Sequence, residues 1–348
     1  MNTARLQHTA TRLLDGSVLI VGGGSGSTYA ADASAERFDP LTGSWTGTGE
    51  MVEARLLHTA TLLQDGRLLV VGGVGGNGGS LGSAELYDPS TGSWTTTGNL
   101  GTPRVGHTAT LLTDGTVLVV GGSNVGMALA SAELYDPVSG TWTRTGDLAA
   151  PHSEHTATLL PDGSLLVAGG ELVPSDLPQH PSAELYDPGT GSWTATGNMV
   201  APTVGHIATL LPDGRVFAAG GDIYRVEANT RGNPLSSAQL LDPARGTWTA
   251  TSNMSVPRDT HMAELLTDGT VLVAGGFSAK GGEHLASAER YEPVSGGWFS
   301  AAAMNVKRGF ATAALLADGR VLVTAGLDSI AGQGNQLASA ELYDPNGS

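Results

Sequence analysis

The fold of this chain is decided by one stretch of sequence, His107-Thr-Ala-Thr-Leu-Leu-Thr-Asp114-Gly115-Thr-Val-Leu-Val-Val-Gly121-Gly122. A short segment with β-branched residues comes first, then an Asp-Gly pair, then an apolar run that ends in two glycines. Asp-Gly between two such segments predicts a β-hairpin with positive φ at both central positions of the turn. The apolar run has no alternation with polar residues, which predicts a strand buried on both faces.

The same order of features occurs seven times, about 50 residues apart, with Ala325-Gly326 in place of the Gly pair in the seventh unit. Each unit continues with Ser-Ala-Glu-Leu-Tyr-Asp-Pro or a close relative, and a Trp follows the aromatic residue at a fixed distance in most units. We therefore expect four short strands in each unit, and we find no segment with helical periodicity. A unit of this size cannot bury both faces of its sheet alone, so neighbouring units must stack side by side.

An apolar run ending in Gly-Gly, then an aromatic residue, then a Trp at a fixed distance resembles the kelch repeat. The resemblance covers essentially the whole chain. It implies an all-β fold, with one seven-bladed β-propeller domain over residues 1–348 built from four-stranded blades. The blades are expected to start near residues 8, 58, 107, 155, 206, 261 and 311. No Trp follows Tyr343-Asp344-Pro345, so the last blade should lack its outermost strand.

The composition excludes several classes of function. The chain has 33 Asp+Glu against 17 Lys+Arg, a net charge of -16, which argues against nucleic acid as a partner. No apolar run reaches the roughly 18 residues that could span a membrane, so a membrane partner is not expected either. Most of the acids belong to the repeat itself. The similarity between blades resembles bacterial kelch proteins, which are often exported, with any leader removed.

Residues that repeat in every blade are expected to build blades, and residues that break the repeat are better candidates for function. Six histidines that open the first strand are therefore interpreted as structural, each bonding neighbouring backbone. An Arg three positions before the first strand occurs in five blades, at Arg5, Arg55, Arg104, Arg258 and Arg308. Guanidinium groups bind carboxylates and phosphates bidentately, so these five residues are candidates for ligand binding at the channel mouth. The alternative is that this Arg is a residue common to the family that forms a salt bridge with a loop acid.

Loops that lengthen on a fixed scaffold often carry binding residues. The longest loop after a Gly pair lies in blade five and supplies Tyr224, Arg225 and Arg231 as further candidates. The favoured function is thus a non-catalytic recognition module that engages a peptide, a glycan or a small acidic ligand on the loop face around the mouth. A third possibility is self-association through the open edge of blade seven.

The alternative function is an enzyme with acid/base or metal-dependent chemistry near blades five to seven. Its catalytic candidates are His152, Asp259 and Glu264, and its metal-ligand candidates are Glu171, His180 and His284. Glu264 replaces a Thr in an innermost strand, so it is expected to have a cation or a hydrogen-bond partner. The kelch enzyme relevant to this alternative is galactose oxidase, which uses copper and a Tyr crosslinked to a Cys. This chain has no Cys and cannot form that cofactor, and the sequence assigns no other.

Overall fold

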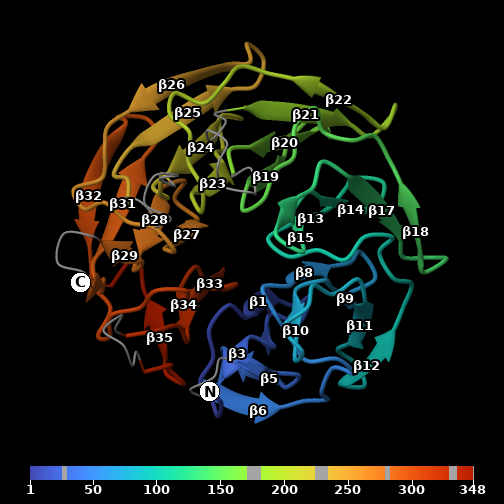
Figure 1. Ribbon diagram of the computed structural model, residues 1–348. Coiled ribbons are helices and arrows are strands. Elements are labelled where there is room, and N and C mark those ends of the chain that lie inside the picture. The colour runs from blue at the N-terminus through green and yellow to red at the C-terminus, as the bar shows by residue number, and fades with distance from the viewer. Residues whose placement is uncertain (26–29, 171–181, 224–233, 279–282, 329–334, 348) are drawn as a thin grey trace.

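The computed structural model describes residues 1–25, 30–170, 182–223, 234–278, 283–328 and 335–347. Over these ranges the chain forms a ring of seven small antiparallel sheets around a central opening (Figure 1). The described part contains strands and turns but no helix, so no helix there could cross a membrane. The sequence-based prediction of an all-β, seven-bladed propeller is confirmed.

Each blade has its first strand innermost and its later strands successively farther out. The first strands are β1 (Thr9–Arg12), β8 (Thr59–Leu62), β13 (Thr108–Leu111), β19 (Thr156–Leu159), β23 (Ile207–Leu210), β27 (Met262–Leu265) and β33 (Thr312–Leu315). The second strands are β2 (Val18–Val21), β9 (Leu68–Val71), β14 (Val117–Val120), β20 (Leu165–Ala168), β24 (Val216–Ala219), β28 (Val271–Ala274) and β34 (Val321–Thr324).

The outer half of each blade carries the aromatic pair. The third strands are β5 (Ala35–Asp39), β11 (Ala84–Asp88), β17 (Ala132–Asp136), β21 (Ala183–Asp187), β25 (Ala238–Asp242), β31 (Ala288–Glu292) and β35 (Ala340–Tyr343). The fourth strands are β6 (Ser44–Gly47), β12 (Ser93–Thr96), β18 (Thr141–Arg144), β22 (Ser192–Ala195), β26 (Thr247–Thr251) and β32 (Gly297–Ala301). Blade seven has three strands, as predicted.

The second strands form the core, because every residue of each is buried. Val117 and Val119 of blade three, for example, pack in one cluster with Leu69 and Val71 of blade two. Such clusters lie between neighbouring blades, so each blade depends on the next for burial of its apolar face. This explains why the second strands show no alternation in sequence.

The Asp-Gly hairpins differ from the prediction in one respect. Gly16 has φ of 87°, whereas Asp15 is not among the residues with positive φ. The amide of Leu13 bonds the carbonyl of Ser17, and the amide of Gly16 bonds the carbonyl of Leu13, which defines a three-residue loop. The Asp side chain is used instead as a cap, since Asp15 Oδ1 accepts the amide of Ser17 at 3.0 Å.

The Gly pairs close the ring. Gly23 donates its amide to the carbonyl of Arg55 in the next blade, and an equivalent bond joins every neighbouring pair of blades. The last of these runs from Gly326 of blade seven to Arg5 of blade one, at 3.0 Å. A Cβ atom on Gly22 would lie 2.6 Å from the Arg55 carbonyl oxygen, so glycine suits this close approach, although blade seven has Ala325 at the equivalent position.

Candidate functional site

The loops that enter the first strands surround one mouth of the central channel. Small two-stranded extensions lie on the same face, at β3 (Gly24–Ser25) with β4 (Ala30–Ala31), β7 (Arg55–Leu56) with β10 (Val74–Gly75), β15 (Ser123–Asn124) with β16 (Met127–Ala128), and β29 (Phe277–Ser278) with β30 (Glu283–His284). The residue before each repeated His, or before Ala311 in blade seven, has φ between 47° and 65°. These rim residues are Gln7, Leu57, Gly106, Glu154, Gly205, Thr260 and Phe310.

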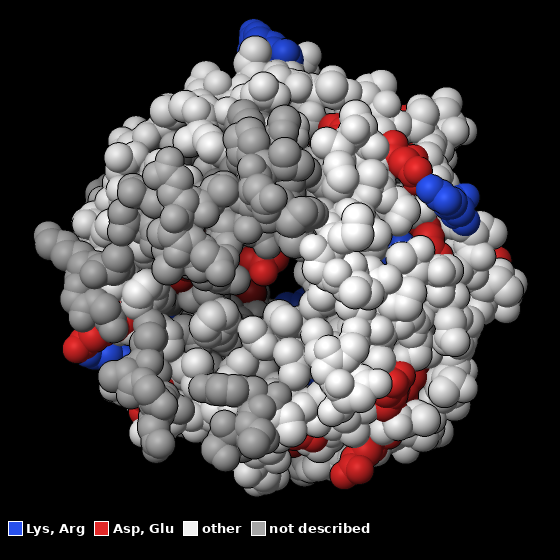
Figure 2. Space-filling model, in the orientation of Figure 1, with Lys and Arg blue, Asp and Glu red and all other residues white. Residues whose placement is uncertain are grey.

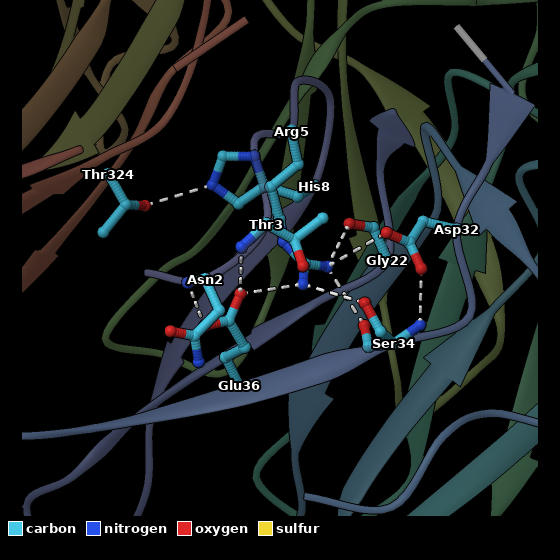
Figure 3. A network of polar contacts seen from close by, with 9 residues as sticks. All are labelled: Asn2, Thr3, Arg5, His8, Gly22, Asp32, Ser34, Glu36 and Thr324. Atoms are coloured by element: carbon cyan, nitrogen blue, oxygen red, sulfur yellow. Dashed lines mark hydrogen bonds and ion pairs between the residues drawn. The ribbon is translucent and has the colours of Figure 1, made fainter. Parts of the chain in front are cut away.

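Arg5 shows what the repeated arginines do (Figure 3). Its side chain is fully buried, with 0% of its surface exposed. Nη1 donates to the carbonyl oxygens of Gly22 at 2.9 Å and Ser34 at 3.0 Å, and Nη2 donates to Glu36 Oε1 at 3.1 Å. The carboxylate of Glu36 in turn accepts the amides of Asn2 and Thr3. The guanidinium therefore ties the entry loop to the second and third strands of its own blade.

The other four arginines repeat this arrangement without exception. Each has 0% of its surface exposed and an Nη2 atom 2.7–2.9 Å from a strand-three glutamate. The pairs are Arg55–Glu85, Arg104–Glu133, Arg258–Glu289 and Arg308–Glu341. Because these side chains have no exposed surface for a ligand, the five arginines do not form the ligand-binding site expected at the channel mouth. The arrangement is the ion-pair alternative, with a strand-three acid rather than a loop acid as partner.

Blade four exchanges the Arg of this pair, and blade five exchanges both members. His152 takes the Arg position in blade four, where its Nδ1 lies 2.6 Å from the carbonyl of Gly169. Its Nε2 lies 3.7 Å from Glu184. In blade five Thr203 replaces the Arg and bonds the carbonyl of Gly220 at 3.0 Å, while Gln239 replaces the Glu. The cation and the anion are lost together, as expected if they stabilise each other.

The repeated histidines join neighbouring blades. Thr9 Oγ1 lies 3.0 Å from Nε2 of His58 in the next blade, and equivalent bonds link Thr59 to His107 and Thr108 to His155. Two more occur at Thr156–His206 and Thr312–His8. The structural role predicted for these histidines agrees with the geometry, but the partner is a threonine hydroxyl and not backbone.

Burial keeps these imidazoles neutral. It lowers the pKa of His8, His107 and His261 to about 3 and that of His206 to about 4. The pKa values of His58 and His155 are also well below the ordinary value, again mainly because of burial. A neutral imidazole can donate a hydrogen bond to a hydroxyl group or accept one from it. It can therefore form the Thr–His hydrogen bonds between blades, which we call bridges.

The bridges are interrupted on both sides of blade six. Ile207 replaces the Thr of blade five, and His261 Nε2 consequently has no hydrogen-bond partner among the described residues. Between blades six and seven, Met262 and Ala311 replace both members of the bridge. Four pairs of rim residues from neighbouring blades are joined by backbone hydrogen bonds. In two of them the amide of Glu154 donates to the carbonyl of Gly106 at 2.9 Å, and the amide of Phe310 donates to the carbonyl of Thr260 at 3.2 Å. Among the described residues, the junction of blades five and six has neither a rim bond nor a bridge.

Glu264 lies on the innermost strand of blade six, three residues beyond His261. The equivalent residues are Thr11, Thr61, Thr110, Thr158, Thr209 and Ala314. Glu264 is partly exposed, and an innermost strand meets solvent only along the channel. Burial raises the pKa of its carboxyl group to about 7. Within the part of the chain that the structure describes, no hydrogen bond or ion pair satisfies this carboxyl group, so the partner expected from the sequence is missing.

Two more acids that break the repeat lie where the loops enter the first strands of blades five and six. Asp222 follows Gly221 in blade five, and Asp259 follows Arg258 in blade six. The amide of Gly221 bonds the carbonyl of Arg258 at 3.0 Å, so both acids adjoin the same bond between blades. They are 2% and 4% exposed, respectively. Figure 2 shows acidic atoms at the edge of the central opening. Asp222 was not identified from the sequence, although it is an acid at a position that is apolar or small in most blades.

The catalytic candidates are not brought together as one group. His152 belongs to blade four and is engaged by Gly169, whereas Asp259 and Glu264 belong to blade six. Blade five separates them. An acid/base pair of His152 with either carboxylate is therefore not formed.

The metal-ligand and loop candidates are distributed as follows. Glu171, His180, Tyr224, Arg225 and Arg231 lie outside the described residues. His284 is 1% exposed and contacts the rings of Phe277 and Phe310 edge-on, at centroid distances of 6.3 and 6.4 Å. Over the described ranges, no three His, Asp or Glu residues lie close enough to hold a metal ion.

Comparisons with known proteins agree with the fold. Residues 7–221 match the family model of the KLHDC2/KLHL20/DRC7 kelch-repeats domain. The search of curated proteins gave no match. Among solved structures, a novel fungal alcohol oxidase of the AA5 family, in complex with copper, superposes with a TM-score of 0.79 at 20% identity. The alignment covers 99% of this chain and 74% of the oxidase. At that identity the likeness concerns the fold alone, and the oxidase's copper is not carried over to a chain without Cys.

Proposed function

The chain belongs to the kelch-repeat family, whose propellers indicate a binding module, and from that premise we propose that it is a non-catalytic recognition protein for a peptide or a glycan. The ligand binds at the channel mouth beside blades five to seven. The observation that carries this proposal is Glu264, a carboxyl group in the channel wall that no described residue neutralises. A buried carboxyl group without a partner is costly, so a ligand that supplies one gains affinity.

The chemistry of the mouth favours a ligand with a cationic or hydrogen-bond-donating group. The sequence suggested an acidic ligand because of the five repeated arginines, but their side chains are fully buried within their blades. Glu264, which breaks the repeat in blade six, is instead an acid that keeps part of its surface exposed. Glu264 lies three residues beyond His261, about 10 Å along the channel. A slender arm such as a lysine side chain or an amino sugar fits that depth.

The test is a binding screen on peptide and amine-bearing glycan arrays. Wild-type protein is compared with Glu264→Thr, which restores the residue of the repeat, and with Thr110→Ser at the same strand position in blade three. We expect cationic ligands to bind wild type and Thr110→Ser but to lose about tenfold or more with Glu264→Thr. Equal binding by all three proteins would refute the proposed site.

One observation supports the enzyme alternative. A pKa of about 7 suits a general acid or base near neutral pH. This alternative requires turnover of a bound ligand that is abolished by Glu264→Gln. Binding without turnover would instead leave Glu264 as a recognition residue.

A further inference from the structure

The last residue of the first strand breaks the repeat in blade one. Arg12 closes β1, whereas the other six blades have a leucine at the equivalent position. Its side chain is exposed, and Nη1 donates to the carbonyl of Leu315 in blade seven at 3.1 Å. The hairpin acids of these two blades, Asp15 and Asp318, pair with arginines of their own blades. Among the residues that the structure describes, Arg12 therefore has no anionic partner.

Glu264 and Arg12 flank the same strand of blade seven. β33 contacts β27 of blade six on one side and β1 of blade one on the other. Arg12 reaches β33 through its bond to Leu315. Glu264 occupies the position that Thr61 has in blade two, and the hydroxyl of Thr61 donates to the carbonyl of Ala109 in the following blade at 3.5 Å. Glu264 therefore lies on the face of β27 that meets blade seven.

The exchange of a threonine for Glu264 replaces a hydrogen-bond donor by an acceptor. The carbonyl equivalent to that of Ala109 belongs to Ala313 in blade seven. An ionised Glu264 has no proton to donate to this carbonyl, so two acceptors meet where blades two and three have a hydrogen bond. An ammonium group has three N–H donors and no acceptor, so it can satisfy the carboxylate and the carbonyl together.

We propose that the ligand of the channel is zwitterionic, with an amine that binds Glu264 and an anionic group about 7 Å away that binds Arg12. The spacing follows from β33, because the carbonyls of Ala313 and Leu315 are two residues apart on that strand. A guanidinium group binds a carboxylate or a phosphate through paired hydrogen bonds. Figure 2 shows basic as well as acidic atoms at the central opening. This inference rests on the proposed function and specifies the chemistry of its ligand.

The probes are three compounds of the same chain length, ε-aminocaproate, hexylamine and caproate, and their binding to the full chain is measured by ligand-observed NMR. Arg12→Leu restores the residue of the repeat, and Glu264→Thr does the same in blade six. Arg144→Leu is the matched control, because it removes an exposed arginine of the outer strand β18. We expect wild type and Arg144→Leu to bind ε-aminocaproate about tenfold more tightly than hexylamine. Arg12→Leu should bind the two amines equally, and Glu264→Thr should bind neither.

The results separate this inference from the proposed function. Equal binding of ε-aminocaproate and hexylamine by wild type would overturn the inference, as would a preference that persists in Arg12→Leu. If Glu264→Thr still abolishes the binding of hexylamine in either case, the proposed function stands without the anionic group. Binding of ε-aminocaproate that is absent, or that Glu264→Thr leaves unchanged, would overturn both.

Two further probes distinguish the sources of such a ligand. Acetyl-Lys-Glu-amide represents a peptide, and glucosamine phosphate represents a glycan. We expect one of them to bind wild type and to be weakened about tenfold or more by Arg12→Leu and by Glu264→Thr, which identifies the source. If neither probe binds in this way, the zwitterionic site is refuted for both classes of ligand.

Discussion

Arg104 and Glu133 form an ion pair, with 2.7 Å between Nη2 and Oε1, in which the arginine is fully buried and the glutamate nearly so. The same pair occurs in five blades, and blade five replaces both members, by Thr203 and Gln239. The same two buried positions are thus occupied by a charged Arg–Glu pair in five blades and by neutral Thr and Gln side chains in blade five.

Removing one member of the pair should be far worse than exchanging both. Arg104→Thr leaves Glu133 buried without its cation and should lower the free energy of unfolding by about 3–5 kcal/mol. Arg104→Thr combined with Glu133→Gln copies blade five and should recover most of that loss. Urea unfolding followed by tryptophan fluorescence measures both variants. A double variant as unstable as the single one would contradict the account of the pair.

The bridges between blades should contribute measurably to stability. Thr108→Val keeps the shape of the side chain but removes the hydroxyl that bonds His155 at 2.9 Å. We expect a loss of about 1 kcal/mol in the free energy of unfolding. Ile207→Val, at the equivalent position in blade five, breaks no hydrogen bond and serves as the control. The prediction fails if Thr108→Val unfolds at the same urea concentration as wild type.

Mild acid should destabilise the propeller because of its buried histidines. Folding lowers their pKa values, to about 3 for His8, His107 and His261, from an ordinary value of 6.5. Between pH 6.5 and 3 the unfolded chain therefore binds more protons than the folded one. Stability is highest above pH 6.5 and falls as the pH decreases, by up to about 1.4 kcal/mol per pH unit for each imidazole. Thermal unfolding measured from pH 7.5 to pH 5 checks this. A constant midpoint over that range would contradict it.

Glu264 should have the opposite pH dependence. Its pKa is raised on folding from 4.5 to about 7, so the folded chain binds the extra proton between those values. The cost of burying the carboxylate is absent below pH 4.5 and complete above pH 7. Glu264→Gln should therefore stabilise the protein by roughly 2 kcal/mol at pH 8 and by very little at pH 5. Unfolding of both proteins at the two pH values measures the difference. Equal differences at pH 5 and pH 8 would show that burial does not perturb this carboxyl group.

The fold could be predicted from the sequence because each blade repeats the same signals. Seven copies of the apolar run and of Asp-Gly leave little freedom, and the absent Trp after Tyr343 predicted the three-stranded last blade. The role of the arginines could not be settled in that way. Their position near the mouth suggested ligand binding, whereas their burial depends on how the side chain folds back beneath its own loop. The paired exchange of Thr203 and Gln239 was the available signal, since independent surface residues have no reason to change together.

The site itself was only partly predictable. Glu264 was identified because it breaks a repeated Thr, but its missing partner is a property of the packed channel. Asp222 was overlooked because its position beside the bond between Gly221 and Arg258, two residues that lie far apart within the sequence of blades five and six, is visible only in the folded chain. The separation of His152 from Glu264 likewise follows from the order of blades around the ring.

The central claim is that residues that recur from blade to blade stabilise the propeller, whereas Glu264 binds the ligand. The most direct measurement compares two variants for binding to the best cationic ligand found on the arrays. Glu264→Thr should fold as well as wild type but lose the ligand. The double variant Arg104→Thr with Glu133→Gln should retain the ligand. Loss of binding in the double variant together with normal binding by Glu264→Thr would contradict the account.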